Sequence, residues 1–237
     1  MKTALIIPAL NEEPVIGQML QRIPPTLFDQ IIVADNGSTD RTGEIASSLG
    51  ATVVRREQRG YGIACLAAIA QLNPVIDTIV FMQADLSEVP EECLRLLTPI
   101  QDGCADLVIG SRTLGTAEPG ALLPHQDFGN RLACTLMRLL FRHTYTDLGP
   151  FRAIRRAALE CLAMQETSYG WTVEMQVRAL QQELRVMEVP VTYKRRAAGV
   201  NKVSGNWKAS LQAGVRIIGT ILRLYVRYGS ASKSNSR

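Results

Sequence analysis

Short apolar runs rich in β-branched residues alternate along the first half of the chain with segments that repeat apolar residues at helical spacing. The strand-like runs are TALIIPAL, QIIVADN, ATVVRR, TIVFMQAD and DLVIGSR. Parallel strands need a crossover connection, and this alternation is the pattern of a mainly parallel sheet covered by helices on both faces. We therefore expect an α/β fold in which helices sandwich such a sheet.

After the fifth strand-like run the alternation gives way to polar loops and helices. The pattern predicts a long mobile loop over 113–129, a helix over about 130–143 and a final helix over about 206–228. Between the two helices, TDLGPFRAIRR is expected to be a turn that enters another short helix. The expected organisation is one domain over 1–205, then the final helix, then a disordered tail over 229–237.

The final predicted helix has two different faces. One face is basic and polar: Lys208, Gln212, Arg216, Thr220, Arg223 and Arg227. The opposite face is apolar: Leu211, Val215, Ile218, Leu222 and Tyr225. One interpretation is a helix packed on its own domain, and the other is a basic amphipathic helix lying on an anionic membrane surface. No stretch reaches the ~18 uncharged apolar residues that a membrane span requires.

Charge is distributed unevenly within a net charge of +4. The segment 185–237 contains many Lys and Arg residues but a single acid, Glu188, whereas the preceding chain is acidic overall. A basic segment on an acidic body indicates an anionic partner, such as phosphates, a lipid surface or nucleic acid. The interleaving of basic and aromatic residues that stacks nucleic-acid bases is missing, which argues against nucleic acid. The five cysteines have no paired or metal-like spacing, which indicates free thiols in a reducing cytosol.

Polar stretches follow several strand-like runs at the point where each would end. In open α/β sheets, ligands bind outside the carboxyl ends of the strands. These stretches are Pro8–Glu12, Asp35–Ser38, Arg59–Gly62 and Gln83–Asp85. Each has an ordinary explanation when taken alone: DNGSTD resembles a helix-capping turn, and the GYG stretch is an incomplete phosphate loop. Their combination predicts a nucleotide site at this edge of the sheet.

The stretch MQADLSE, residues 82–88, raises the question of a metal. Asp85 suits a hard divalent cation that also binds the phosphates of a nucleotide diphosphate. Gln83 offers only a neutral amide oxygen, and a strand continuing through 83–85 would put both side chains on one face. The residues alone leave open a metal site, a damaged one, or a strand that runs into a turn. We predict a working but weakened Mg²⁺ or Mn²⁺ site, with Asp85 as its main protein ligand and Gln83 beside it.

Several motifs together carry a family resemblance. PALNEE, DNGSTD, RGYGIACLAAI and FMQADLSEVPE resemble the N-terminal half of family 2 glycosyltransferases with the GT-A fold. TDLGPFRAIRR, YGWTVEMQ and RRAAGVNKVSGN are similar to the polyprenyl-phosphate mannosyl- and glucosyltransferase branch, and the match spans roughly residues 3–207. The central motif of that branch usually reads Asp-Ala-Asp-Leu-Gln, so Gln83 and Ser87 depart from it.

The resemblance implies roles for individual residues. Four residues are implied to line the nucleotide pocket: Pro8, Leu10, Asn11 and Glu12. Near the base and ribose it implies Asp35 and Arg59, and as clamps on the phosphates it implies Arg196 and Lys202. Toward the sugar and the acceptor it implies Arg112, Arg131, Asp147 and Glu174.

The resemblance also implies the reaction, which is inverting transfer of a sugar from a UDP-glucose or GDP-mannose type of donor. The expected acceptor is polyprenyl phosphate, which is already an anionic nucleophile, whereas a hydroxyl acceptor would need Glu174 or Asp147 as a base. Two other classes stay open: a nucleotide-sugar-binding protein with little catalysis, favoured by Gln83, and a sugar-phosphate nucleotidyltransferase, disfavoured by the acidic PALNEE. We expect an enzyme at the inner face of the cell membrane. The sequence leaves the sugar, the nucleotide and the oligomeric state open.

Overall fold

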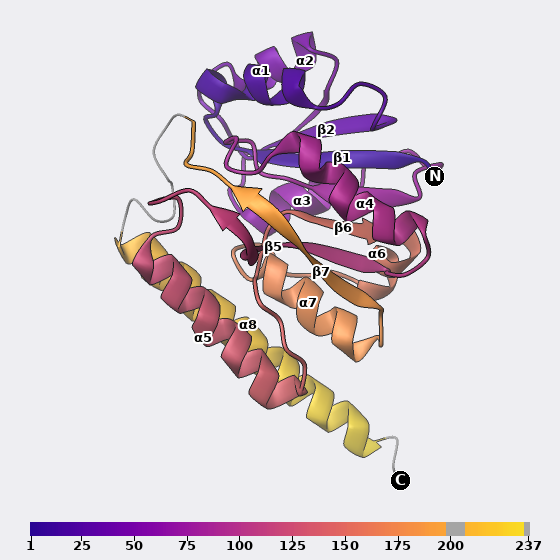
Figure 1. Cartoon of the computed structure of the whole chain (residues 1–237), viewed down its shortest axis with the longest axis vertical. Helices are drawn as coiled ribbons and strands as arrows, with labels where there is room; N and C mark the ends of the chain where they lie inside the picture. The colour runs from indigo at the N-terminus through magenta and orange to yellow at the C-terminus, as the bar shows by residue number, and fades with distance from the viewer. Residues whose placement is uncertain (198–206, 235–237) are drawn as a thin grey trace.

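A computed structural model of the chain describes residues 1–197 and 207–234, with side chains described up to 197 and from 210 to 226. Its centre is one seven-stranded sheet with the order β3-β2-β1-β4-β6-β5-β7 (Figure 1). The strands are β1 (Thr3–Ala9), β2 (Gln30–Asp35), β3 (Thr52–Arg55), β4 (Thr78–Phe81), β5 (Leu107–Ala117), β6 (Arg152–Arg155) and β7 (Val186–Tyr193).

The sheet is mixed but mostly parallel, as predicted. Strands β1 to β4 pair in parallel, as do β5 and β7, whereas β6 lies antiparallel between β4 and β5. Side chains of β1 alternate between two hydrophobic cores, with Ile6 on one face and Leu5 and Ile7 on the other. Both faces of β1 are therefore buried, which explains its nearly continuous apolar sequence.

Helices cover both faces of the sheet (Figure 1). One core contains residues of α1 (Glu13–Arg22), α2 (Thr42–Ser48) and α4 (Cys93–Gln101), which follows the short 3-10 helix η1 (Pro90–Glu92). The other core contains residues of α3 (Tyr61–Ile69), α5 (Pro124–Phe141), α6 (Arg156–Leu162), α7 (Trp171–Gln181) and α8 (Trp207–Ser234). Cys65, Cys93 and Cys134 are buried, and all five cysteines are free thiols, as expected.

The long mobile loop predicted over 113–129 is wrong. Strand β5 continues to Ala117 and pairs with β7 on both sides of an irregularity between Ser111 and Thr116. Gly115 allows this continuation, because a Cβ there would overlap the backbone of Val191. Pro124 then begins α5. Proline suits this first helical position because a backbone N–H there would have no acceptor within the helix. The glycine and prolines that indicated a loop instead serve strand pairing and helix initiation.

Two further boundaries differ from the prediction. TDLGPFRAIRR was expected to be a turn entering a helix, but four of its residues form β6 before α6 begins. Helix α8 continues to Ser234, so residues 229–234 of the predicted disordered tail are helical, and 235–237 lie outside the described residues. Among the described helices, none has the length and apolar character needed to cross a bilayer.

Candidate active site

The carboxyl ends of β1 and β2 are joined by hydrogen bonds between the segments that follow them. Asn11 accepts the Thr39 N–H at 2.8 Å through its side chain, and its own N–H donates to Ser38 Oγ at 3.0 Å. The Asn36 N–H donates to the Ala9 carbonyl at 2.9 Å. The predicted PALNEE and DNGSTD segments therefore form one rim, because parallel strands end at the same edge of the sheet.

Arg196 links this rim to the end of β4. Its guanidinium contacts Asp85 Oδ2 at 3.1 Å and forms a second, shorter ion pair with Glu12 Oε1. Both carboxylates are buried, whereas about a fifth of the arginine side chain is exposed. One cation thus bridges two buried acids, one from the loop after β1 and one from the loop after β4. This brings together three of the predicted site residues.

The Asp85 loop is a turn rather than a continued strand. Strand β4 ends at Phe81, residues 84–85 form a turn, and Leu86 directly after it has a φ of 59°. The expectation that Gln83 and Asp85 share a strand face is therefore wrong. Asp85 Oδ1 instead accepts the Ser87 N–H at 3.0 Å and the Ser87 hydroxyl at 2.5 Å. Such local side-chain bonds favour a turn over an extended strand.

A buried acid, Glu88, supports this loop from beneath. Its Oε2 accepts the Gln83 N–H at 2.8 Å, and among the described residues its Oε1 has no hydrogen-bond partner. Burial raises the pKa of Glu88 to about 8. The carboxyl is therefore predominantly protonated at neutral pH and adds little charge beneath Asp85.

The donor set at Asp85 fits a divalent cation that is held jointly with phosphate. Mg²⁺ and similar ions are commonly bound by one or two carboxylates plus substrate phosphate oxygens. Asp85 and Glu12 supply such oxygens, and the guanidinium of Arg196 already lies where positive charge is favourable. Within residues 1–197 and 207–234, no three His, Cys, Asp or Glu side chains cluster for a metal. These residues therefore do not make a complete metal site without substrate.

A second buried ion pair lies where β5 leaves the core. Arg112 forms a two-pronged contact with Asp147, with Nη2 to Oδ1 at 2.6 Å and Nε to Oδ2 at 2.8 Å. The guanidinium lies 5.1 Å from the centre of the Tyr193 ring, and the hydrogen bond and charge of Asp147 outweigh burial to raise the pKa of Arg112. Glu188 holds the backbone beside Asp147 by accepting N–H groups of Thr146 and Asp147. Asp147 thus orients the guanidinium of Arg112.

Glu174 and Arg131 lie apart from these clusters. Glu174 is buried on α7, where its carboxylate accepts the N–H groups of Gln165 and Glu166 and pairs with Arg178 at 2.9 Å. Arg131 lies on the exposed side of α5 and pairs with Asp127. Their predicted roles toward the acceptor stay predictions, and the contacts described for them are structural.

The remaining predicted residues line the rim or lie beyond the described chain. Asp35 is buried and accepts the Ser38 N–H at 2.8 Å, with Arg55 at 3.3 Å. Arg59 is exposed and adjoins Gly60, whose N–H donates to the Asn36 side chain. Two half-buried residues of the first segment are Pro8 and Leu10. Lys202 lies outside the described residues.

The GYG stretch does not cradle a ligand. A Cβ on Gly62 would overlap the Glu166 carbonyl, and a Cβ on Gly60 would overlap the Thr167 carbonyl. The Ile63 N–H, in the first turn of α3, donates to that same Thr167 carbonyl at 3.1 Å. The glycines therefore let the loop between α6 and α7 pack against the start of α3, which is a structural role.

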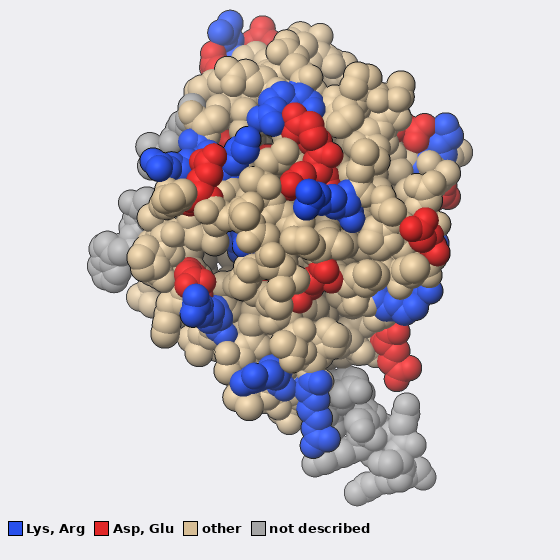
Figure 2. Space-filling model, in the orientation of Figure 1, with Lys and Arg blue, Asp and Glu red and all other residues tan. Residues whose placement is uncertain are grey.

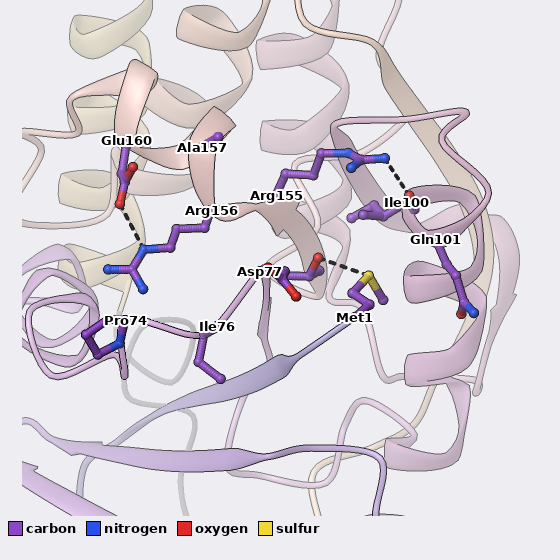
Figure 3. Close-up of a pocket in the computed structure, with 11 residues that line it drawn as sticks. Met1, Pro74, Ile76, Asp77, Ile100, Gln101, Arg155, Arg156, Ala157 and Glu160 are labelled. Atoms are coloured by element: carbon purple, nitrogen blue, oxygen red, sulfur yellow. Dashed lines mark hydrogen bonds and ion pairs between the residues drawn. The ribbon is translucent and has the colours of Figure 1, made fainter.

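A pocket of about 640 Å³ lies at the opposite edge of the sheet, near the start of β4 (Figure 3). Arg155 and Arg156 line it, and both are engaged within the protein. Arg155 donates to the Ile100 carbonyl at 2.6 Å, and Arg156 donates to Glu160 at 2.9 Å. It adjoins the amino ends of the parallel strands, so it is separate from the edge where the predicted site residues gather.

The residues that sequence reasoning missed support those that it found. They are Ser87, Glu88, Glu188 and Tyr193. Ser87 and Glu88 belong to the quoted MQADLSE stretch, so their position was a usable signal. Nothing local indicated Glu188 and Tyr193, because they act through strand β7, which reaches the site only in the folded sheet.

Comparison with known proteins places these motifs in a family. Residues 4–163 match the family model described as glycosyl transferase family 2. A polyprenol monophosphomannose synthase of Mycolicibacterium smegmatis is 32% identical over 225 residues, covering 86% of this chain and 82% of that protein.

Two further relatives and one solved structure complete the comparison. An undecaprenyl-phosphate mannosyltransferase of Micrococcus luteus is 28% identical over 249 residues, covering 98% of this chain and 96% of that protein. A low-salt glycan biosynthesis hexosyltransferase of Haloferax volcanii is 33% identical, and this chain spans only 49% of its length. A glucosyl-3-phosphoglycerate synthase of Mycobacterium tuberculosis, solved with Mn²⁺, UDP-glucose and phosphoglyceric acid, shares the fold with a TM-score of 0.77, 24% identity, and coverage of 94% of this chain and 79% of that one.

Proposed function

The chain belongs to glycosyl transferase family 2, and we propose that it transfers a sugar from a nucleotide-diphosphate sugar to polyprenyl phosphate. The observation that supports binding of a nucleotide-diphosphate sugar is the ion-pair bridge from Glu12 through Arg196 to Asp85. A diphosphate needs positive charge on its oxygens, and this edge of the sheet offers an arginine fork and carboxylates suited to a divalent cation. When bound there, Mg²⁺ or Mn²⁺ would neutralise the leaving diphosphate.

The state of the two predicted bases supports a phosphate acceptor. Asp147 is committed to Arg112, and Glu174 is committed to Arg178 and two backbone N–H groups. A hydroxyl acceptor would need one of them to accept a proton, whereas a phosphate acceptor is already ionised. The names of the M. smegmatis and M. luteus relatives point to the same class of acceptor.

The proposed step is one displacement with inversion at the anomeric carbon. An acceptor phosphate oxygen forms the new bond to that carbon while the bond from the carbon to the donor diphosphate breaks. The nucleoside diphosphate leaves with the electron pair, and Arg196 stabilises its growing charge. Arg112, held by Asp147, orients the acceptor phosphate, and Lys202 assists on the diphosphate. Because a polyprenyl acceptor resides in a membrane, we place the enzyme peripherally at the inner face of the cell membrane.

The test is a screen of UDP- and GDP-sugars with Mg²⁺ or Mn²⁺, with and without a short polyprenyl phosphate. Metal-dependent release of nucleoside diphosphate that rises when the lipid phosphate is added supports the proposal. Tight binding of a nucleotide sugar without turnover under any condition would favour the alternative of a binding protein with little catalysis, for which Gln83 in place of an acid is the supporting feature.

A further inference from the structure

Part of the basic side of α8 contacts a buried acid of the protein, although the side chains of Arg216 and Arg223 stay 47% and 44% exposed. Glu166, a buried residue of the loop before α7, accepts a hydrogen bond from Arg216 Nε at 2.8 Å and one from Arg223 Nη2 at 2.9 Å. The hydroxyl of Thr220 donates to the same carboxylate at 3.2 Å. The charges of both arginines are therefore partly balanced within the fold, and they contribute less to an anionic surface than the sequence predicted.

The buried side of α8 contains Ala213, Thr220, Ile221 and Leu224, and an apolar stripe lies exposed on the opposite side. Leu211, Val215, Leu222 and Val226 are 60%, 65%, 45% and 68% exposed. Their spacings of four, seven and four residues align them in one stripe along the helix. The stripe is about 22 Å long at 1.5 Å per residue. Large apolar side chains gathered in this way on a surface mark a contact with another apolar phase or partner.

Helix α5 extends this surface. Phe128, Leu132 and Leu139 are exposed on α5. The two helices lie side by side (Figure 1), with His125 close to Ser210 near their starts and Phe141 packed edge-on against Tyr225 further along. We call the exposed apolar residues the α5–α8 face: Phe128, Leu132, Leu139, Leu211, Val215, Leu222 and Val226.

Basic residues accompany the apolar stripe on α5. Arg131, Arg138 and Arg142 are exposed, and Arg131 also pairs with Asp127. Figure 2 shows Lys and Arg side chains along the lower left of the molecule, where α5 lies, with uncharged atoms and an acidic side chain among them. Exposed aliphatic and aromatic side chains beside arginines match the acyl region and the anionic headgroups of a bilayer, respectively. A contact between two copies of this chain would bring these like charges together.

The face also begins beside the proposed acceptor site. Asn130 of α5 accepts the Leu148 N–H at 2.9 Å and donates to the Thr146 carbonyl, on either side of Asp147. Asp147 holds Arg112, which we assign to the acceptor phosphate. A lipid whose phosphate reaches Arg112 would therefore have its chain next to α5.

We propose that the α5–α8 face inserts into the headgroup region of a membrane and holds the site at the bilayer surface. The inference rests on the proposed lipid-phosphate acceptor. The sequence predicted that the basic charge of α8 would bind an anionic membrane. In this inference, insertion of apolar side chains supplies most of the binding instead. Arg131, Arg138 and Arg142 add a smaller, salt-sensitive part.

Vesicle co-sedimentation tests the surface, using phosphatidylcholine alone or mixed with phosphatidylglycerol, at low and high salt. The variant is Leu139→Glu with Leu222→Glu, and the matched control is Leu94→Glu, an exposed leucine of α4 on the other core. Circular dichroism checks that each variant is folded. We expect the wild type to keep much of its binding at high salt, the double variant to lose roughly tenfold or more in partitioning, and the control to match the wild type.

Three outcomes would overturn the inference. One is equal vesicle binding by the wild type and the double variant, and another is no vesicle binding by the wild type. The third is a wild-type dimer, measured by light scattering, that the double variant dissociates. Transfer to a short polyprenyl phosphate by the wild type is measured separately. If that transfer is missing, the proposed function fails, whereas transfer without α5–α8-dependent vesicle binding contradicts only this inference.

Discussion

Two charge clusters with buried acids have opposite ratios of acid to arginine among the described residues. At the carboxyl edge of the sheet, one arginine, Arg196, bridges two acids, Glu12 and Asp85. Beneath α8, one acid, Glu166, bridges two arginines. Among the described residues, the first cluster has more acids than cations and suits an added cation, whereas the second has its acid fully buried and fixes a helix. The same residue types therefore serve ligand binding in one place and architecture in the other.

Loss of Asp85 should have the largest effect. Asp85→Ala removes the acid at the end of β4 and should abolish metal-stimulated nucleotide binding, with kcat lowered by about 10²–10³. Calorimetry with and without Mn²⁺ measures the binding. Unchanged nucleotide affinity in the presence of metal would show that the assignment of Asp85 is wrong.

Arg196→Ala should weaken the binding of nucleoside diphosphate and strengthen the binding of Mn²⁺ alone. Nucleoside diphosphate binding should weaken by about 1.5–3 kcal/mol, and binding of the nucleoside alone should change less. Mn²⁺ alone should bind more tightly, because Glu12 and Asp85 lose the cation that bridges them. Electron paramagnetic resonance of free Mn²⁺ measures the second effect. Equal losses for diphosphate and nucleoside would indicate a folding defect instead.

Glu166→Gln should lower the free energy of unfolding by on the order of 1–2 kcal/mol without changing nucleotide affinity. The loss is modest because the two arginines are partly exposed to solvent. Burial alone would raise the pKa of Glu166, but the hydrogen bonds from Arg216 and Arg223 outweigh it and lower the pKa. The stabilisation is therefore present above the unfolded pKa of about 4.3 and is lost as the pH falls through the lower folded pKa. Thermal melts from pH 7 to pH 3 should converge for the wild type and the variant. A constant difference across that range would contradict this role.

Gln83→Asp should have the smallest effect. A second acid near Asp85 would tighten the binding of Mn²⁺ with nucleotide diphosphate by up to about tenfold. The gain is limited because residues 84–85 turn away from the strand direction. Titration of Mn²⁺ in the presence of the nucleotide measures it. Weaker binding by this variant would indicate that position 83 does not face the cation.

The part of the molecule predicted best from sequence is the part organised by local patterns. Alternating runs gave the strands, and the ends of parallel strands brought Asn11 and Ser38 together as expected. The role of Arg196 as a phosphate clamp stays a prediction, and its contact with both acids depends on where the segment after β7 folds back.

Features that depend on distant partners were missed. The two faces of α8 were visible in the sequence, but the ion pairs of its basic face depend on Glu166, which lies 50 residues before Arg216. The loop predicted over 113–129 failed because pairing with β7 extended β5. Asp147 was assigned as a possible base from its motif, and only the fold reveals its partner, Arg112.

The most direct test of the account is analysis of the product made from a labelled nucleotide sugar and a short polyprenyl phosphate with Mn²⁺. The account predicts a sugar joined to the lipid phosphate with inverted anomeric configuration, formed by the wild type and lost in Asp85→Ala and on chelation of the metal. Mass spectrometry and nuclear magnetic resonance identify the product and its configuration. Undiminished product from Asp85→Ala, or sugar found only on a hydroxyl acceptor, would contradict it.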